Sequence, residues 1–185
     1  EANNGKSNTF SGSYQSAVDT LESKLLDAVN SQMHADVPLG AFLSGGVDSS
    51  TIVALMQKQS SKKVKTFSIG FEDNRFNEAT YAKSVANHLS TDHNEMYVTS
   101  KDALNVLPLL PDIFDEPFAD SSQIPMYLVS KVAKTKVKVC LSGDGGDELF
   151  GGYNRYLIAS KFWSRISKMP GPAKGMLTYL IKNIK

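Results

Sequence analysis

The chain contains a single cysteine, Cys140, and no long apolar run among its 185 residues. One cysteine cannot form an internal disulfide, so the class of small disulfide-stabilised secreted domains is excluded. The longest uninterrupted apolar stretches hold only a handful of residues, far fewer than the roughly 20 that a membrane-spanning helix needs. The polar start of the sequence also lacks the apolar core of a signal peptide. Together these absences predict a cytoplasmic protein.

Acidic residues are missing from the last 37 positions. Up to Glu148 there are 13 basic and 19 acidic residues, a net charge of −6, and only seven basic residues follow. Such asymmetry is found in tails that bind nucleic acid or membranes. Here the basic residues are spread along a predicted helix, so neither partner is expected. With 41% hydrophobic and 21% charged residues, the composition is that of a soluble globular domain.

Predicted strands and helices alternate along the chain. Apolar residues at helical spacing predict a helix from Tyr14 to Met33. Strands are predicted at 37–43, 64–71, 93–99 and 137–141, and further helices around 52–56 and at 78–89, 102–114 and 124–134. This alternation indicates an α/β fold, a parallel sheet with helices on both faces. Residues 1–13 are rich in Asn, Ser and Gly and are predicted to be a disordered lead-in, followed by one domain over 14–155.

The end of the sequence carries two apolar helical stripes, separated by Pro170-Gly171-Pro172. The first stripe consists of Tyr156, Ala159, Trp163, Ile166 and Met169, and the second of Met176, Leu177, Leu180, Ile181 and Ile184. An amphipathic helix buries its apolar face. The stripes therefore either pack on the domain's own sheet or meet parts of a longer protein. We expect the second, with 156–185 as the start of a truncated helical C-terminal region.

The segment SGGVDSS at 44–50 joins a predicted buried strand to a helix. Gly45 and Gly46 allow a tight turn that presents backbone N–H groups to an anion, and the helix dipole points to the same place. Three hydroxyl groups, those of Ser44, Ser49 and Ser50, add further donors. The loop lacks the lysine of a Walker A motif, and it is not the dinucleotide motif G-x-G-x-x-G either. We interpret it as a phosphate cradle of another kind.

Asp48 lies inside this cradle, where its negative charge would repel a phosphate unless a cation lay between them. It therefore indicates Mg²⁺ shared with a polyphosphate. The alternative is that Asp48 only caps the start of the helix, a common role for aspartate. The residue alone does not separate these two interpretations.

A second glycine-rich segment, LSGDGGDELFGGY at 141–153, follows the last predicted strand. It holds five glycines, which a solvated acidic loop would not need. Ligands of open parallel sheets bind beyond the carboxyl ends of the strands, so glycine turns on neighbouring strands would face each other. Asp147 would then complete a metal site with Asp48, leaving Asp144 or Glu148 for proton transfer.

The first motif resembles the S-G-G-x-D-S signature of the N-type (PP-loop) ATP pyrophosphatases, whose fold is adenine nucleotide alpha hydrolase-like. That signature is shared by GMP, NAD and argininosuccinate synthetases and by tRNA-thiolating enzymes. LSGDGGDELFGGYNRY at 141–156 and DEPFADSSQIP at 115–125 are more specific. They resemble the synthetase domain of the glutamine-hydrolysing asparagine synthetases, and the likeness runs from about Tyr14 to Tyr156.

The resemblance implies an ATP- and Mg²⁺-dependent ligase. A carboxylate, aspartate in the family's main reaction, is activated as acyl-AMP with release of pyrophosphate, and ammonia from a glutaminase domain then forms the amide. The implied metal ligands are Asp48 and Asp147, and the implied catalytic residue is Asp144. The implied ATP-binding residues are Leu43, Ser44, Gly45, Gly46, Asp48, Ser49, Ser50, Ile69, Ser142 and Gly143. For Leu43 and Ile69, plain core packing is compatible with this role.

Several features keep alternatives open. Asp144 stands where the best-known asparagine synthetases carry glutamate, so another carboxylate, such as a sugar acid, is a second candidate substrate. A nucleotide-binding module without turnover is the non-enzymatic alternative, whereas tRNA thiolation would require more cysteines and a basic face. The family's catalytic lysine beyond the second motif does not map onto Lys161, Lys168 or Lys174. A homodimer is possible.

The remaining candidate ligands and nucleophiles are few. His34, His88 and His93 have no metal-ligand spacing and are interpreted as incidental. Cys140, within a predicted buried strand, is interpreted as a small core residue and not a nucleophile. The family's glutaminase half uses an N-terminal cysteine, whereas this chain starts with Glu1. The ammonia is therefore expected to be free or to come from a domain that is missing here.

Overall fold

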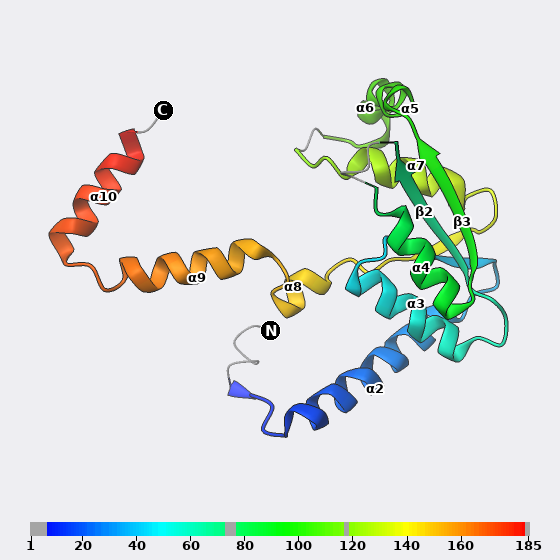
Figure 1. Ribbon diagram of the computed structural model, residues 1–185, viewed down its shortest axis with the longest axis horizontal. Coiled ribbons are helices and arrows are strands. Elements are labelled where there is room, and N and C mark those ends of the chain that lie inside the picture. The colour runs from blue at the N-terminus through cyan, green and yellow to red at the C-terminus, as the bar shows by residue number, and fades with distance from the viewer. Residues whose placement is uncertain (1–6, 73–76, 117–118, 184–185) are drawn as a thin grey trace. The chain divides into compact units, whose positions relative to one another are not determined.

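The computed structural model describes residues 7–72, 77–116 and 119–183, in two compact units, Glu1–Gly143 and Asp144–Lys185 (Figure 1). The first unit holds the sheet. Its strands are β1 Leu39–Phe42, β2 Lys65–Phe71, β3 Asp92–Val98 and β4 Val139–Leu141. Its helices are α2 Tyr14–Met33, α3 Val47–Gln59, α4 Ala79–Leu89, α5 Ser100–Val106, η1 Leu107–Leu109, α6 Leu110–Ile113 and α7 Gln123–Ala133.

The four strands form one sheet in the order β3-β2-β1-β4, and every pair is parallel. The predicted α/β fold is therefore confirmed, and the predicted strands differ from the observed ones only at their ends. The chain moves outward from β1 to β3 and then returns through α5–α7 to place β4 on the other side of β1. The winding reverses between β1 and β4, the place where open α/β sheets bind ligands.

Helices cover both faces of this sheet, because side chains alternate along each strand. On one face, Ala41 and Leu43 pack with apolar residues of α2, α3 and α4. On the other, Phe67 is fully buried beside Val129 of α7, and Phe42 packs against the same cluster. The sheet is therefore a buried middle layer, as expected for parallel strands.

The start of α2 is fixed by Ser13, whose side-chain oxygen accepts a hydrogen bond from the backbone N–H of Ser16 at 3.1 Å. Such capping satisfies one of the unpaired donors of the first helical turn. The predicted disordered lead-in, 1–13, thus contributes the cap of α2, while its residues 1–6 lie outside the described part.

The single helix predicted over 102–114 is wrong: this segment contains α5, η1 and α6 instead. Pro108 lies in the first turn of η1 and Pro111 in the first turn of α6. Proline has no N–H to donate within a helix and suits a first helical turn, so each proline starts a new element.

The second unit consists of helices α8 Gly146–Phe150, α9 Asn154–Ile166 and α10 Gly171–Asn183. The predicted break at 170–172 separates α9 from α10. The apolar stripes lie on these two helices, but residue 184 and the side chains of Leu177, Leu180 and Ile181 lie outside the described residues. The limits proposed for the domains, 14–155 and 156–185, remain predictions, as do both explanations of the stripes. Across the described ranges, no helix is long and apolar enough to cross a membrane.

Candidate nucleotide-binding site

The predicted phosphate cradle lies at the carboxyl end of β1, where the chain turns into α3. Gly45 has a φ of +84°, a backbone conformation that L side chains rarely adopt. Gly46 is the N-cap residue of α3, and no side chain caps this helix by a hydrogen bond. Asp48 lies inside the first turn. The N-cap residue is therefore Gly46 and not Asp48. In the first turn, Asp48 also interacts favourably with the helix dipole, and its role as a metal ligand stays a prediction.

Hydroxyl groups hold the cradle in a closed turn. The side-chain oxygens of Ser44 and Ser49 lie 2.9 Å apart and share a hydrogen bond. The Ser49 oxygen also accepts from the backbone N–H of Ser44 at 3.2 Å, and the Ser44 oxygen accepts from the N–H of Gly46 at 3.3 Å. These hydrogen bonds connect the end of β1 with the first turn of α3 and restrict the conformation of the loop between them.

Ser50 is the one partly buried residue in the described ranges whose buried side-chain oxygen has no hydrogen-bond partner. A buried hydroxyl without a partner costs free energy, so such a group is rare in a native structure and calls for an explanation. Its position in the first turn of α3 is consistent with a ligand whose polar atoms complete the hydrogen bond. The cradle thus fits a polyphosphate.

The second glycine motif reaches this cradle within the first unit. Gly143 follows β4, and a Cβ at this position would lie 2.6 Å from the backbone N of Ser49 and 2.8 Å from the carbonyl carbon of Asp48. Only a residue without a side chain allows the two backbones to approach this closely. The structure therefore brings together Gly143 and the loop 44–50, which are separated by about 90 residues in the sequence.

Two other predicted ATP-binding residues have clear packing roles. Leu43 is 1% exposed, and its backbone N–H donates to the carbonyl oxygen of Phe67 at 2.9 Å, extending the pairing of β1 and β2. Ile69 is half-buried on β2 and packs toward α7. Ser142 is exposed between Leu141 and Gly143. Leu43 and Ile69 thus support the site through the core, which is compatible with contact to a nucleotide.

In the second unit, Asp147 lies in the first turn of α8. Its Oδ1 occupies the space that a Cβ of Gly152 would fill, and the N–H of Gly152 donates to the Asp147 carbonyl oxygen at 3.0 Å. Gly145 and Gly151, with φ of 92° and 67°, begin and end the short helix. The glycines of this motif therefore shape a turn around the Asp147 carboxylate, a feature that a solvated acidic loop would not require.

Glu148, one of two candidates for proton transfer, is engaged within its own unit. Its carboxylate accepts a hydrogen bond from the Tyr153 hydroxyl at 2.5 Å, and this bond lowers the pKa of Glu148. The same contact raises the pKa of Tyr153 to about 12. The guanidinium of Arg155 lies 4.0 Å from the centre of the Tyr153 ring. With its pKa lowered in this way, Glu148 is a weaker base than an ordinary carboxylate.

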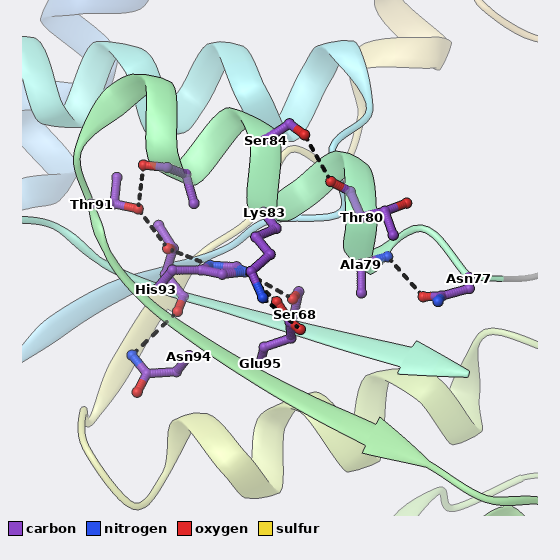
Figure 2. A network of polar contacts seen from close by, with 12 residues as sticks. Ser68, Asn77, Ala79, Thr80, Lys83, Ser84, Thr91, His93, Asn94 and Glu95 are labelled. Atoms are coloured by element: carbon purple, nitrogen blue, oxygen red, sulfur yellow. Dashed lines mark hydrogen bonds and ion pairs between the residues drawn. The ribbon is translucent and has the colours of Figure 1, made fainter. Parts of the chain in front are cut away.

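Within the residues that the structure covers, no three His, Cys, Asp or Glu side chains cluster as a metal site. His93, interpreted as incidental because it lacks metal-ligand spacing, takes part in a network of hydrogen bonds. His93 is half-buried on β3, with hydrogen bonds to Thr66 at 2.9 Å and to Ser68 at 3.2 Å (Figure 2). The signal for this network in the sequence is a pair of polar residues at alternate positions of each strand: Thr66 and Ser68 on the buried β2, His93 and Glu95 on the edge strand β3.

Cys140 is half-buried beside the cluster of Phe67 and Val137, as predicted for a core residue. Burial raises the pKa of its thiol to about 11, so the nucleophilic thiolate is scarce at neutral pH. Cys140 also lines a hollow of about 350 Å³ between α7 and β4, together with Phe42, Lys134 and Lys138. None of the predicted ligand residues lies in this hollow.

Comparison with known proteins gives consistent results. The family model described as asparagine synthase matches residues 20–184. Asparagine synthetase [glutamine-hydrolyzing] 1 of Bacillus subtilis is 42% identical over 165 residues, which is 88% of this chain and 26% of that protein. A putative asparagine synthetase [glutamine-hydrolyzing] 2 of Methanocaldococcus jannaschii is 48% identical over 134 residues, 72% of this chain and 26% of that protein. The chain thus spans about a quarter of these relatives.

Solved structures share the fold at low sequence identity. An NH3-dependent NAD synthetase from Campylobacter jejuni has a TM-score of 0.51 and 15% identity, covering 74% of this chain and 60% of that one. An NMN synthetase from Francisella tularensis has a TM-score of 0.52 and 16% identity, covering 73% and 58%. These similarities confirm the predicted fold, a parallel sheet with helices on both faces.

Proposed function

The chain belongs to the asparagine synthase family, and on this premise we propose that it is the ATP-dependent synthetase part of an amide-forming ligase. The observation that carries the proposal is the loop 44–50. It is a glycine turn with an uncapped helix start and the unpartnered Ser50 hydroxyl, and it lies where the sheet reverses its winding. That combination supports the binding of ATP phosphates.

In the proposed site the N–H groups of the first turn of α3 and the hydroxyls of Ser44, Ser49 and Ser50 hold the pyrophosphate portion of ATP. The mutual hydrogen bond of Ser44 and Ser49 pre-organises the loop, so little ordering is needed when ATP binds. Gly143 keeps the loop after β4 close against this turn. Leu43, Ile69 and Ser142 complete the adenosine side.

The residues present also suit Mg²⁺. Asp48 offers a carboxylate in the first turn of α3, beside the phosphate cradle. Asp147 is the second ligand that the family resemblance implies. Carboxylate and phosphate oxygens are the ligands that Mg²⁺ prefers. When bound, the ion would offset the negative charge that develops on the departing pyrophosphate.

The proposed reaction has two steps. A carboxylate oxygen of the acceptor attacks the α-phosphorus of ATP, the bond between the α-phosphorus and the bridging oxygen breaks, and pyrophosphate leaves toward the cradle. Ammonia then attacks the acyl carbon, AMP leaves, and the proton lost by nitrogen passes to Asp144, giving the amide. Because the relatives are named as glutamine-hydrolysing, we propose that glutamine is the source of the ammonia.

Aspartate is the proposed acceptor. A second acceptor class, such as a sugar acid, is favoured by one observation: Asp144 is one methylene shorter than the glutamate of the best-known synthetases, so its carboxylate reaches less far from the backbone. The reaction steps are the same for either acceptor.

The test is ATP–pyrophosphate exchange by the full-length protein with Mg²⁺ and a panel of carboxylates that includes aspartate and sugar acids. We expect exchange with one class, and a loss of about 100-fold or more in Asp48→Asn, as for the removal of a group that stabilises transition-state charge. Asp19→Asn is the matched control, because its carboxylate only accepts an exposed hydrogen bond from Gln15 on α2.

Two results would contradict the proposal. If no carboxylate supports exchange while ATP binds tightly in calorimetry, the domain is a binding module without turnover. If Asp48→Asn exchanges as fast as Asp19→Asn, the cradle does not hold the reacting phosphates.

A further inference from the structure

Helix α4 packs directly against the phosphate cradle at Gly45 and forms the wall of the cradle on that side. A Cβ on Gly45 would lie 2.6 Å from the backbone N of Ala82 and 2.7 Å from the Cβ of Tyr81. The turn of the cradle and the N-terminal half of α4 are therefore in direct backbone contact. Any shift of α4 along or away from the sheet moves the surface that shapes the cradle at Gly45.

Small side chains make up the fully buried part of the face that α4 turns to the core, and Val85 and Leu89 pack beside them while partly buried. Ala79, Ala82 and Ala86 are each at most 1% exposed. Alanines allow the helix to approach closely, but they interdigitate little with the layer below, and dispersion grows with the number of atoms in contact. The alanines therefore define the position of α4 along the sheet only weakly, and Val85, Leu89 and polar contacts add to it.

A series of polar contacts connects α4 with the sheet below it, and it begins and ends on α4 (Figure 2). At the first end, Lys83 Nζ lies 3.6 Å from Glu95 Oε1 on β3, and Glu95 Oε2 lies 3.8 Å from His93 Nε2. Glu95 and His93 are mostly buried, with side chains 15% and 11% exposed. The ion pair is thus shielded from solvent on its acidic side.

From His93 the series returns to α4 through two threonines. His93 Nδ1 lies 2.9 Å from the Thr66 hydroxyl, which lies 3.0 Å from the Thr91 hydroxyl. The backbone N–H of Thr91 donates to the Ala86 carbonyl oxygen at 3.0 Å, and its hydroxyl donates to the same oxygen at 3.5 Å. Lys83 and Ala86 are three residues apart, so both ends of the series contact the same turn of α4.

One protonation state satisfies the part of the series that runs from His93 to Ala86. With the proton of neutral His93 on Nδ1, the ring donates to Thr66, Thr66 donates to Thr91, and Thr91 donates to the carbonyl oxygen on α4. The Ser68 hydroxyl, 3.2 Å away, then donates to Nε2. From His93 to Ala86 the donors then all point the same way. Nε2 of the neutral ring has no proton to donate to Glu95, so the 3.8 Å contact between them is not an ion pair in this state.

We propose that Lys83, Glu95 and His93 are positioning residues for ATP: by fixing α4 on the sheet they fix the wall that shapes the cradle at Gly45. This inference rests on the proposed function, since it assumes that the cradle binds ATP. None of the three residues is proposed to touch the nucleotide. Their effect is transmitted by α4 through the contacts of Tyr81 and Ala82 with Gly45.

The experiment is a double-mutant cycle in the full-length protein with Lys83→Met, Glu95→Gln and the two together. ATP–pyrophosphate exchange is measured well below the melting temperature of each variant, with ATP and the carboxylate varied separately. We expect each single change to lower kcat/KM for ATP by about tenfold, the order of effect of a sub-ångström displacement of a binding loop. The double variant should be no worse, and KM for the carboxylate should not change.

Glu22→Gln is the matched control. It removes a carboxylate from the 2.7 Å ion pair between Lys58 of α3 and Glu22 of α2, and neither residue belongs to the series described above. We expect its kcat/KM for ATP to equal that of the unmodified protein. A purely structural role of the series would lower melting temperatures and leave kcat/KM for ATP at the control value.

The outcomes separate the two proposals. If the unmodified protein shows no exchange with any carboxylate, the proposed function fails. If it exchanges normally and Lys83→Met and Glu95→Gln behave like Glu22→Gln, the positioning role is wrong and the proposed function stands. The Lys83 side chain is 61% exposed, so Lys83→Met should fold. If Glu95→Gln does not fold, Lys83→Met by itself tests the positioning role.

Discussion

Replacing Gly143 by alanine should push apart the two loops that meet at the proposed nucleotide site. The new Cβ would lie 2.6 Å from the Ser49 nitrogen, 0.8 Å short of the 3.4 Å at which ordinary contact begins, and the atoms that it meets are backbone atoms of Asp48 and Ser49. Neither a rotamer change nor a flexible side-chain end can relieve this overlap. The cradle or the loop after β4 must therefore move by close to 1 Å.

The expected magnitudes follow from this displacement. Overpacking by one methyl group costs about 1–3 kcal/mol of folding free energy. A misplacement of about 1 Å in a site that positions reacting groups lowers the rate about 100-fold. Gly143→Ala should therefore remain folded with a lower melting temperature, and should lose about two orders of magnitude in kcat/KM for ATP.

The assays are thermal unfolding and ATP–pyrophosphate exchange of the full-length protein. Gly175→Ala is the matched control: it adds the same methyl in open space within α10, where alanine is the better helix former, so its stability should not fall. If Gly143→Ala matches Gly175→Ala in both melting temperature and kcat/KM, then the close contact between the two loops is not what shapes the site.

Three further predictions concern groups with shifted pKa values. Tyr153→Phe removes the hydrogen bond that lowers the pKa of Glu148, so the pKa of that carboxyl should rise in a carboxyl-detected NMR titration; an unchanged value would show that Tyr153 is not its partner. Burial lowers the pKa of His93 below 6.5, outweighing the opposing attraction of Glu95, so the unfolded chain binds a proton more readily than the native state. Stability should therefore be lost as pH falls below about 6.5, and His93→Gln should flatten this part of the melting-temperature profile; an equal slope in both proteins would contradict the assignment. Cys140, with a pKa of about 11, should react with iodoacetamide at pH 7.5 far more slowly than a free thiol, and rapid labelling of the native protein would contradict its burial.

Much of the fold was predictable from local patterns. Strong alternation of apolar strands and amphipathic helices is a property of consecutive residues, so the four strands and α2, α4 and α7 were found within a few residues of their true ends. The segment 102–114 was not, because its apolar spacing outweighed the prolines at 108 and 111 in the prediction. Those prolines decide where each short helix begins.

The candidate site was predictable in the same uneven way. The loop 44–50 is contiguous, so the sequence alone predicts a phosphate cradle from its glycines, its serines and Asp48. The polar contacts that connect α4 with β2 and β3 could not be predicted from the sequence. Their residues come from α4, β2 and β3, and His93 became meaningful only when Thr66, Ser68 and Glu95 were found beside it.

By itself, the sequence determined the parallel α/β class, the family resemblance and the chemical character of both glycine motifs, because each depends on residues that are neighbours along the chain. The tertiary structure alone decided that β4 lies beside β1, that Gly143 touches the cradle and that α4 supports Gly45. These are contacts between distant segments, fixed by strand order and by which backbones can approach without a side chain between them. No local pattern in the sequence encodes such distances.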